Sequence, residues 1–148
     1  VMGTQQILMI VLSVIIVGIA VGVGITMFQN QARSSNRQAL LGDLRNFSSN
    51  AIAFYKIPAS MGGGGNGKPG FVGSSGTELG RYLGFPSTGI LENDNGTYTL
   101  GTPTATQVTI TGVGTEVSQD GTHKVEAGVI ITANPTTGAI KDSIYTTY

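Results

Sequence analysis

The chain has 148 residues, a formal net charge of zero and no cysteine, and only 11% of its residues are charged. The balanced charge argues against nucleic-acid binding, and the missing cysteines exclude disulfides, thiol catalysis and iron–sulfur ligation. The length allows one modest domain with an appendage.

The N-terminal segment is apolar and uncharged. From Ile7 to Phe28 only Ser13 and Thr26 are polar, and the first charged side chain is Arg33. As a helix this stretch spans about 33 Å, enough for a hydrocarbon core of roughly 30 Å. A secretory signal peptide fits poorly, because no basic region precedes the run and no small-residue cleavage motif follows it. Two interpretations remain: a plain transmembrane anchor, and a helix that sits first in a membrane and later in a protein core.

The helical pattern continues beyond Phe28. Apolar residues recur at helical spacing and form one stripe that we expect to pack against the rest of the chain: Leu40, Leu44, Phe47, Ala51, Phe54 and Tyr55. We expect the opposite face to be solvated; it carries Arg33, Arg37, Asp43, Arg45 and Asn50. Pro58 cannot continue a helix. The pattern predicts one helix over residues 1–57, with 1–28 apolar on all sides and 29–57 amphipathic.

This plan resembles the type IV pilin superfamily over Val1–Ile57. The resemblance implies a short leader removed by a prepilin peptidase, insertion in the inner membrane, and a helical filament whose core is a bundle of apolar half-helices. Most bacterial members begin with an N-methylated phenylalanine and have glutamate at the fifth position, where this chain has Val1 and Gln5. The resemblance makes Val1 the processed N-terminus, whereas cleavage after Gly3 would make Thr4 the first residue.

The family glutamate is thought to pair with the terminal amine of a neighbouring subunit. Gln5, in the same place, can accept a hydrogen bond from an amine but cannot neutralise it, so we expect weaker inter-subunit registration there. We expect the filament core to be built from the bulky apolar residues of the segment, namely Ile7, Leu8, Ile10, Val11, Leu12, Val14, Ile15, Ile16, Val17, Ile19 and Val21.

Three glycines interrupt this apolar segment: Gly18, Gly22 and Gly24. Their spacing permits close contact between helices. They also subtract roughly 3 kcal/mol of helix propensity relative to alanine. Two outcomes follow, close packing or local melting, and we expect melting within Val17–Ile25 in the filament.

Residues 58–89 are rich in glycine and predict a connector. Gly62–Lys68 reads GGGGNGK and matches a phosphate-binding loop, but a helix precedes it and Pro69 stands where that loop needs Ser or Thr. We therefore expect a flexible linker without nucleotide. The stretch Thr77–Gly84 predicts a short helix with Thr77 as its N-cap.

From residue 90 to 148 short alternating runs predict an antiparallel β head. Turn signals occur at Asn95-Gly96, Gln119–Gly121 and Asn134–Gly138, and Val108 and Ile110 alternate with threonines. The fold class is therefore α+β, with the C-terminal half of a long N-terminal helix packed against a small antiparallel sheet.

The head offers little chemistry. His123 is the only histidine and is expected to be solvated beside a turn. Glu92 and Asp94 form a weak calcium candidate, although the spacing of an EF-hand is absent and a plain turn is the preferred interpretation. We predict no catalytic residue, no cofactor and no nucleic-acid partner.

These observations predict a structural protein, the major subunit of an extracellular pilus-like filament that contains many copies of the chain. Its other partners would be the inner membrane before assembly, the prepilin peptidase and the pilus assembly machinery. The alternatives are a pseudopilin of a type II secretion-like system, an archaeal pilin, and a membrane-anchored binding or enzymatic domain. The long amphipathic continuation argues against the archaeal family, whose heads are usually all-β.

Overall fold

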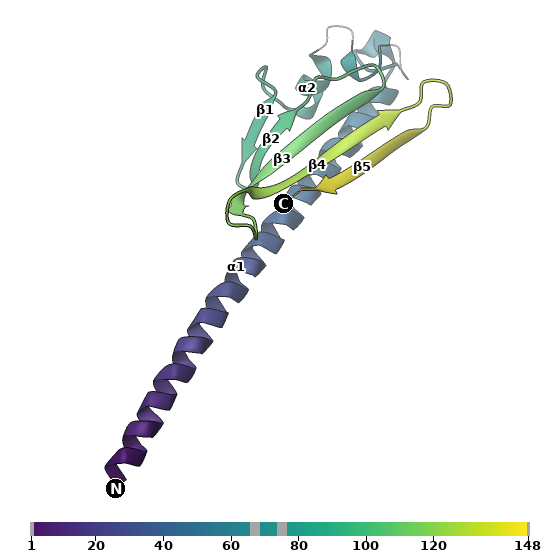
Figure 1. The fold of residues 1–148 in the computed structure, drawn as a ribbon. Coiled ribbons are helices and arrows are strands. Elements are labelled where there is room, and N and C mark those ends of the chain that lie inside the picture. The colour runs from purple at the N-terminus through teal and green to yellow at the C-terminus, as the bar shows by residue number, and fades with distance from the viewer. Residues whose placement is uncertain (1, 66–68, 74–76, 148) are drawn as a thin grey trace.

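A computed structural model of the chain describes residues 2–65, 69–73 and 77–147. One helix, α1, runs unbroken over Met2–Lys56 and is 55 residues long. Its N-terminal half projects as a stalk, and its C-terminal half lies against a β-sheet (Figure 1). This confirms the predicted α+β class. The helix ends two residues before Pro58, whose ring cannot be accommodated in a helix interior.

The sheet is an antiparallel meander of five strands in the order β1-β2-β3-β4-β5. Its strands are β1 (Ile90–Asn93), β2 (Gly96–Leu100), β3 (Gln107–Val117), β4 (Lys124–Ala133) and β5 (Ile140–Thr146). The predicted turn signals lie between β1 and β2, β3 and β4, and β4 and β5. In β3 the buried residues Val108 and Ile110 alternate with half-buried threonines, as the period of a strand requires.

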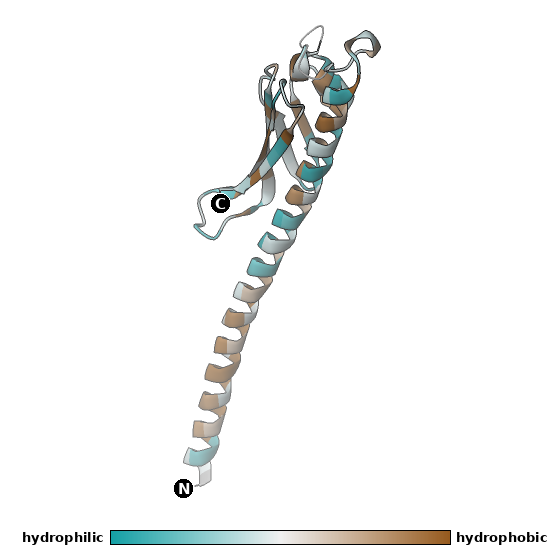
Figure 2. Cartoon of the chain, turned by 90° about the vertical axis from the view of Figure 1, so that its right-hand side faces the viewer, coloured by the Kyte–Doolittle hydropathy of each residue, from teal (hydrophilic) through white to brown (hydrophobic). Residues whose placement is uncertain are grey.

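One face of the sheet packs on α1 and forms the core of the head. The stripe supplies Leu40, Leu44, Ala51, Phe54 and Tyr55, all buried, and the sheet supplies alternate residues of β2, β3 and β4. Phe47 is half-buried, with ring centroids 5.3 Å from Phe85 and 5.2 Å from Tyr98. Figure 2 shows the sheet on one side of the helix only. A small sheet is marginal alone, so the helix completes it as the second layer.

Glycines let the helix approach the middle of the sheet. Gly112 and Gly114 occupy buried positions of β3 where alternation would otherwise place side chains. A Cβ on Gly112 would lie 2.9 Å from the Tyr98 ring, and one on Gly114 would overlap Asn36 of α1. The two glycines therefore make room for groups from β2 and α1.

The segment between helix and sheet belongs to the core of the head. It contains the 3-10 turns η1 (Ala59–Met61) and η2 (Gly70–Val72) and the short helix α2 (Glu78–Leu83). Phe71 of η2 and Leu79 of α2 are buried in the same cluster as the sheet residues. Within the stretch predicted as a flexible linker, Phe71 and Leu79 are thus packed into the head, and the predicted short helix is present as α2.

Two local expectations about this segment need correction. Gly63 and Gly64 are buried, and a Cβ on Gly64 would lie 2.8 Å from the Cα of Tyr55, so part of the glycine run is packed against the end of α1. Lys68 of the loop motif lies outside the described residues. Thr77 precedes α2, but its side chain makes no capping hydrogen bond. The helix ends at Gly84, which takes the left-handed conformation that glycine favours.

Candidate assembly surface

The apolar half of α1 is exposed on every side. Each of its large apolar side chains is at least half-exposed, from Val11 at 50% to Phe28 at 75%. The set includes all the predicted filament-core residues from Ile7 to Val21. Figure 2 shows this part of the helix as almost continuously hydrophobic. By length and composition, α1 is long enough and apolar enough to cross a membrane.

The few polar groups in this segment are satisfied within the helix. Ser13 Oγ donates to the carbonyl oxygen of Met9 at 2.8 Å, and Thr26 Oγ1 donates to that of Gly22 at 3.1 Å. Hydroxyls bonded to the preceding turn need no water. The surface is therefore compatible with an apolar environment of lipid or of other helices.

The glycine-rich part of the stalk is regular helix in this single chain. Gly18, Gly22 and Gly24 lie within α1, and a Cβ built on any of them meets no other atom within 4 Å. The predicted melting concerns the filament and stays a prediction. Gln5 is exposed near the start of the helix, and Val1 lies outside the described residues.

Asp43 forms the main polar contact between helix and sheet. Its Oδ2 accepts hydrogen bonds from Tyr98 Oη at 2.5 Å, Asn95 Nδ2 at 2.8 Å and Asn93 Nδ2 at 3.1 Å. Burial by itself would raise the pKa of Asp43, but the bonds from Tyr98, Asn95 and Asn93 outweigh it and hold the pKa below its usual value. The pKa of the Tyr98 hydroxyl is raised, mainly because the group is buried and also because it donates to Asp43.

This contact was missed at the sequence level. Asp43 was expected on the solvated face, but it is half-buried against the β1–β2 hairpin. Arg33 is likewise half-buried, and its Nε donates to the carbonyl oxygen of Val117 at 2.8 Å. Arg37, Arg45 and Asn50 are exposed as expected. A carboxylate one residue before Leu44 of the stripe, together with the Asn-rich turn, was the available signal.

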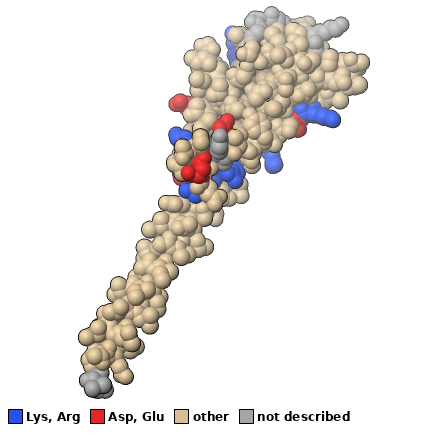
Figure 3. All heavy atoms as spheres, in the orientation of Figure 1, with Lys and Arg blue, Asp and Glu red and all other residues tan. Residues whose placement is uncertain are grey.

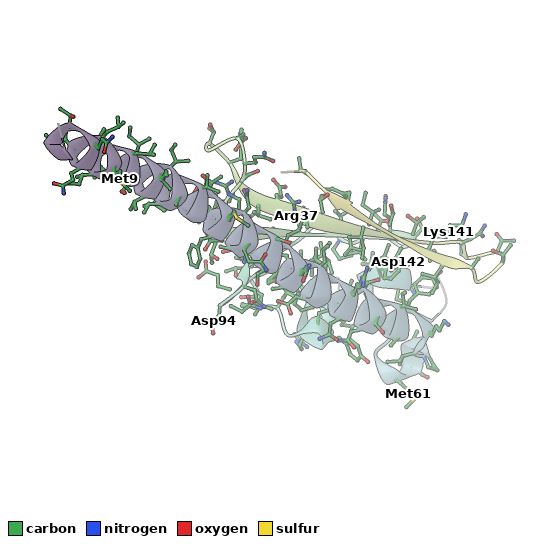
Figure 4. The ribbon with its side chains drawn as sticks, turned by 90° about the horizontal axis from the view of Figure 1, so that it is seen from below. Met9, Arg37, Met61, Asp94, Lys141 and Asp142 are labelled. Carbon is green, nitrogen blue, oxygen red and sulfur yellow. The ribbon has the colours of Figure 1, made fainter. Side chains whose placement is uncertain are left out.

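The calcium candidate is not assembled. Glu92 and Asp94 are exposed, and Figure 4 shows Asp94 pointing outward. The nearby Asn93 Oδ1 is occupied by the backbone N–H groups of Asn95, at 2.9 Å, and Gly96, at 3.1 Å. Within residues 2–65, 69–73 and 77–147 no three His, Cys, Asp or Glu side chains are grouped to hold a metal. The hairpin is held by hydrogen bonds between its own side chains and α1.

His123 is exposed, as expected, but it has a partner in the same turn. Its Nδ1 lies 2.5 Å from Asp120 Oδ2, and its side chain is 53% exposed. This side-chain bond, with backbone N–H bonds from His123 and Thr122, lowers the pKa of Asp120 to about 2. The pair closes the β3–β4 turn.

The described residues thus bring together a packed head and an uncovered apolar stalk. No protein-family model matches the chain, and no curated protein or solved structure is significantly similar to it.

Proposed function

We propose that this chain is the structural major subunit of an extracellular type IV pilus-like filament. The observation that carries the proposal is the contrast within one helix. The C-terminal half of α1 is buried under its own sheet, whereas the apolar half has no covering from the described chain. Such a surface must be surrounded by lipid or by other helices, because exposing it to water costs about 25 cal/mol per Å².

Assembly then follows from the shape of the subunit. The stalk is held in the inner membrane until the assembly machinery extracts it, and stalks from many copies bundle in the filament core. Lipid already shields this surface before assembly, so the gain must come from tight packing and from work done by the machinery. Identical head-to-tail contacts that do not close build an open helix.

Electron microscopy of material sheared from cells tests this proposal. We expect filaments made of this chain, with the stalk residues at the axis. A Leu12→Asp substitution places a charge in the bundle and should abolish filaments, whereas Asn50→Asp adds the same charge on the exposed face of the head and should leave them intact. Absence of filaments in the unsubstituted strain, with the protein present in membranes, would contradict the proposal.

A membrane-anchored binding domain is the second candidate, because the apolar segment matches the thickness of a bilayer. It predicts a detergent-solubilised monomer that never assembles. Tight calcium binding near Glu92 and Asp94 would favour a pseudopilin of a type II secretion-like system, whereas long filaments sheared from cells would favour the pilus.

A further inference from the structure

The head half of α1 has one side that the sheet does not cover (Figure 2). Arg45, Ser49 and Lys56 lie on this side, and all three are exposed. Lys56 follows Arg45 by three helical turns, so the two cations lie on one line along the helix, about 16 Å apart. We call Arg45, Ser49 and Lys56 the basic stripe.

The basic stripe has no acidic neighbour on its own helix. Residues 44–60 contain no Asp or Glu, and Leu41 and Gly42 occupy the remaining positions within helical pairing distance of Arg45. Because α1 is one unbroken helix, its uncovered side continues directly from the stalk, and in a bundle of stalks it faces other copies. A charge that loses water in such a contact needs an opposite charge beside it.

The β1–β2 hairpin carries that opposite charge. Glu92 and Asp94 are both exposed and form what we call the acidic tip. Asp43 of α1 holds the hairpin in place, since its carboxylate accepts hydrogen bonds from Asn93 and Asn95. The acidic tip is therefore fixed before it meets a partner, and little ordering cost remains when it binds.

The acidic tip and the basic stripe lie at similar heights on α1 but on different sides of it. Asp43, which holds the tip, precedes Arg45 by two residues, about 3 Å along the axis and roughly 160° around it. The helix thus separates the tip from the stripe of the same chain, whereas a neighbouring copy can bring its own tip to the stripe. Two different patches make a head-to-tail contact, which builds an open helix when the rotation does not close.

Charge is confined to the part of the chain where such a contact would form. The first charged side chain is Arg33, and Figure 3 shows charged side chains on the head and at its base but none on the stalk. Ionic registration between copies must therefore come from the heads. Gln5 cannot supply it at the start of the helix, because its side chain is neutral.

We propose that the acidic tip of one copy docks on the basic stripe of a neighbouring copy in the filament. Glu92 and Asp94 form ion pairs across this contact with Arg45 and Lys56. The inference rests on the proposed filament. The contact compensates the charges of the stripe where α1 faces other copies, and it fixes the register from one copy to the next.

Reversing the charges in the full chain tests the contact, with the yield of filaments sheared from cells as the readout. Glu92→Lys with Asp94→Lys should lower the yield roughly tenfold, because like charges then face each other. Arg45→Glu with Lys56→Glu should do the same. All four changes together restore opposite charges and should return the yield to within about twofold of the original.

The matched control combines the reversed tip with Lys124→Glu and Lys141→Glu, on exposed sites of β4 and β5. It has the same net charge as the restored chain, but its new carboxylates lie away from the stripe, so the yield should stay low. The thermal midpoint of each purified chain in dodecyl maltoside shows whether the head is folded.

Cross-linking tests the same contact without reversing any charge, in case the reversed chains unfold. The chain has no cysteine. Asp94→Cys combined with Arg45→Cys or with Lys56→Cys should therefore give disulfide-linked copies when filaments are oxidised with copper phenanthroline. Asp94→Cys combined with Lys141→Cys should not.

The outcomes separate this contact from the filament itself. Unchanged yield in both reversed pairs, restoration by the control, or filaments without either cross-link would overturn the inference and leave the filament standing. Absence of filaments from the unsubstituted chain would refute the proposed function, and this contact with it.

Discussion

Tyr98 of β2 donates a hydrogen bond of 2.5 Å to Asp43 in the C-terminal half of α1. Tyr98 is buried, and its ring also packs against Phe47, one turn further along the same helix. The pair therefore joins the two layers of the head through one polar contact and one aromatic contact. Because Asn93 and Asn95 donate to the same carboxylate oxygen, Asp43 also fixes the β1–β2 hairpin to the helix.

Asp43→Asn should destabilise the head by about 1–3 kcal/mol at pH 7, because three donors lose a charged acceptor. The folded pKa of Asp43 is below its unfolded value of about 3.9. Its contribution is therefore fully present above about pH 4 and is lost as the pH falls through the folded pKa. Urea unfolding of the full chain in non-ionic detergent at pH 7 and about pH 3 measures this. Asp94→Asn, on the exposed tip of the same hairpin, should cost less than about 0.5 kcal/mol.

Tyr98→Phe should also destabilise the head, by about 1–2 kcal/mol, because it removes the shortest bond to Asp43 and keeps the ring. Since that bond lowers the pKa of Asp43, the carboxyl should titrate at higher pH in the variant. A double-mutant cycle with Asp43→Asn should give a coupling energy of about 0.5–3 kcal/mol. Additive effects within about 0.3 kcal/mol would show that the two side chains act independently.

Tyr55→Phe should have the opposite effect. Tyr55 is buried, its ring lies 4.8 Å from that of Phe71, and among the described residues its hydroxyl has no hydrogen-bond partner. Removing an unpaired buried hydroxyl relieves a desolvation cost of about 1–3 kcal/mol, so the variant should be neutral or more stable. The comparison with Tyr98→Phe, in the same urea assay, isolates the hydrogen bond from the aromatic ring. A loss above about 1 kcal/mol in Tyr55→Phe would contradict this reading of the hydroxyl.

Gly42→Ala should stabilise the head by about 1 kcal/mol, because Gly42 is exposed within α1 and a Cβ there meets nothing within 4 Å. Gly96→Ala should be strongly destabilising, since its Cβ would overlap the carbonyl oxygen of Val113 in the neighbouring strand. The midpoints of thermal unfolding of the two variants test these two expectations. Equal midpoints would show that the hairpin can move away from β3 without cost.

Replacing Gly18, Gly22 and Gly24 together by alanine tests whether the stalk melts on assembly. The change should add roughly 3 kcal/mol of helix propensity and leave the single-chain helix intact. If the segment unwinds in the filament, we expect a lower filament yield from the variant. A filament map with unbroken helical density from Gln5 to Phe54 would refute the melting hypothesis.

Local pattern was enough to predict the long helix, the short helix after the glycine run and the antiparallel strands of this protein. The apolar stripe from Leu40 to Tyr55 has the period of a helix, and the alternation in β3 has the period of a strand. Pro58 ends a helix for steric reasons. These signals depend on neighbours a few residues away. The same holds for the apolar stalk, which is long and apolar enough, by length and composition, to cross a membrane.

Contacts between residues far apart in the sequence could not be predicted from local pattern. Asp43 and Tyr98 are 55 residues apart, and Arg33 and Val117 are 84 apart. Asp43 lies at the margin of the packed stripe and not on the opposite face where the sequence predicts it, because an asparagine turn of the sheet reaches it. The burial of Phe71 and Gly64 likewise depends on how the connector folds back over the end of α1. Periodicity sets which face of an element is apolar, whereas the partner of each polar group at the margin of that face depends on packing in three dimensions.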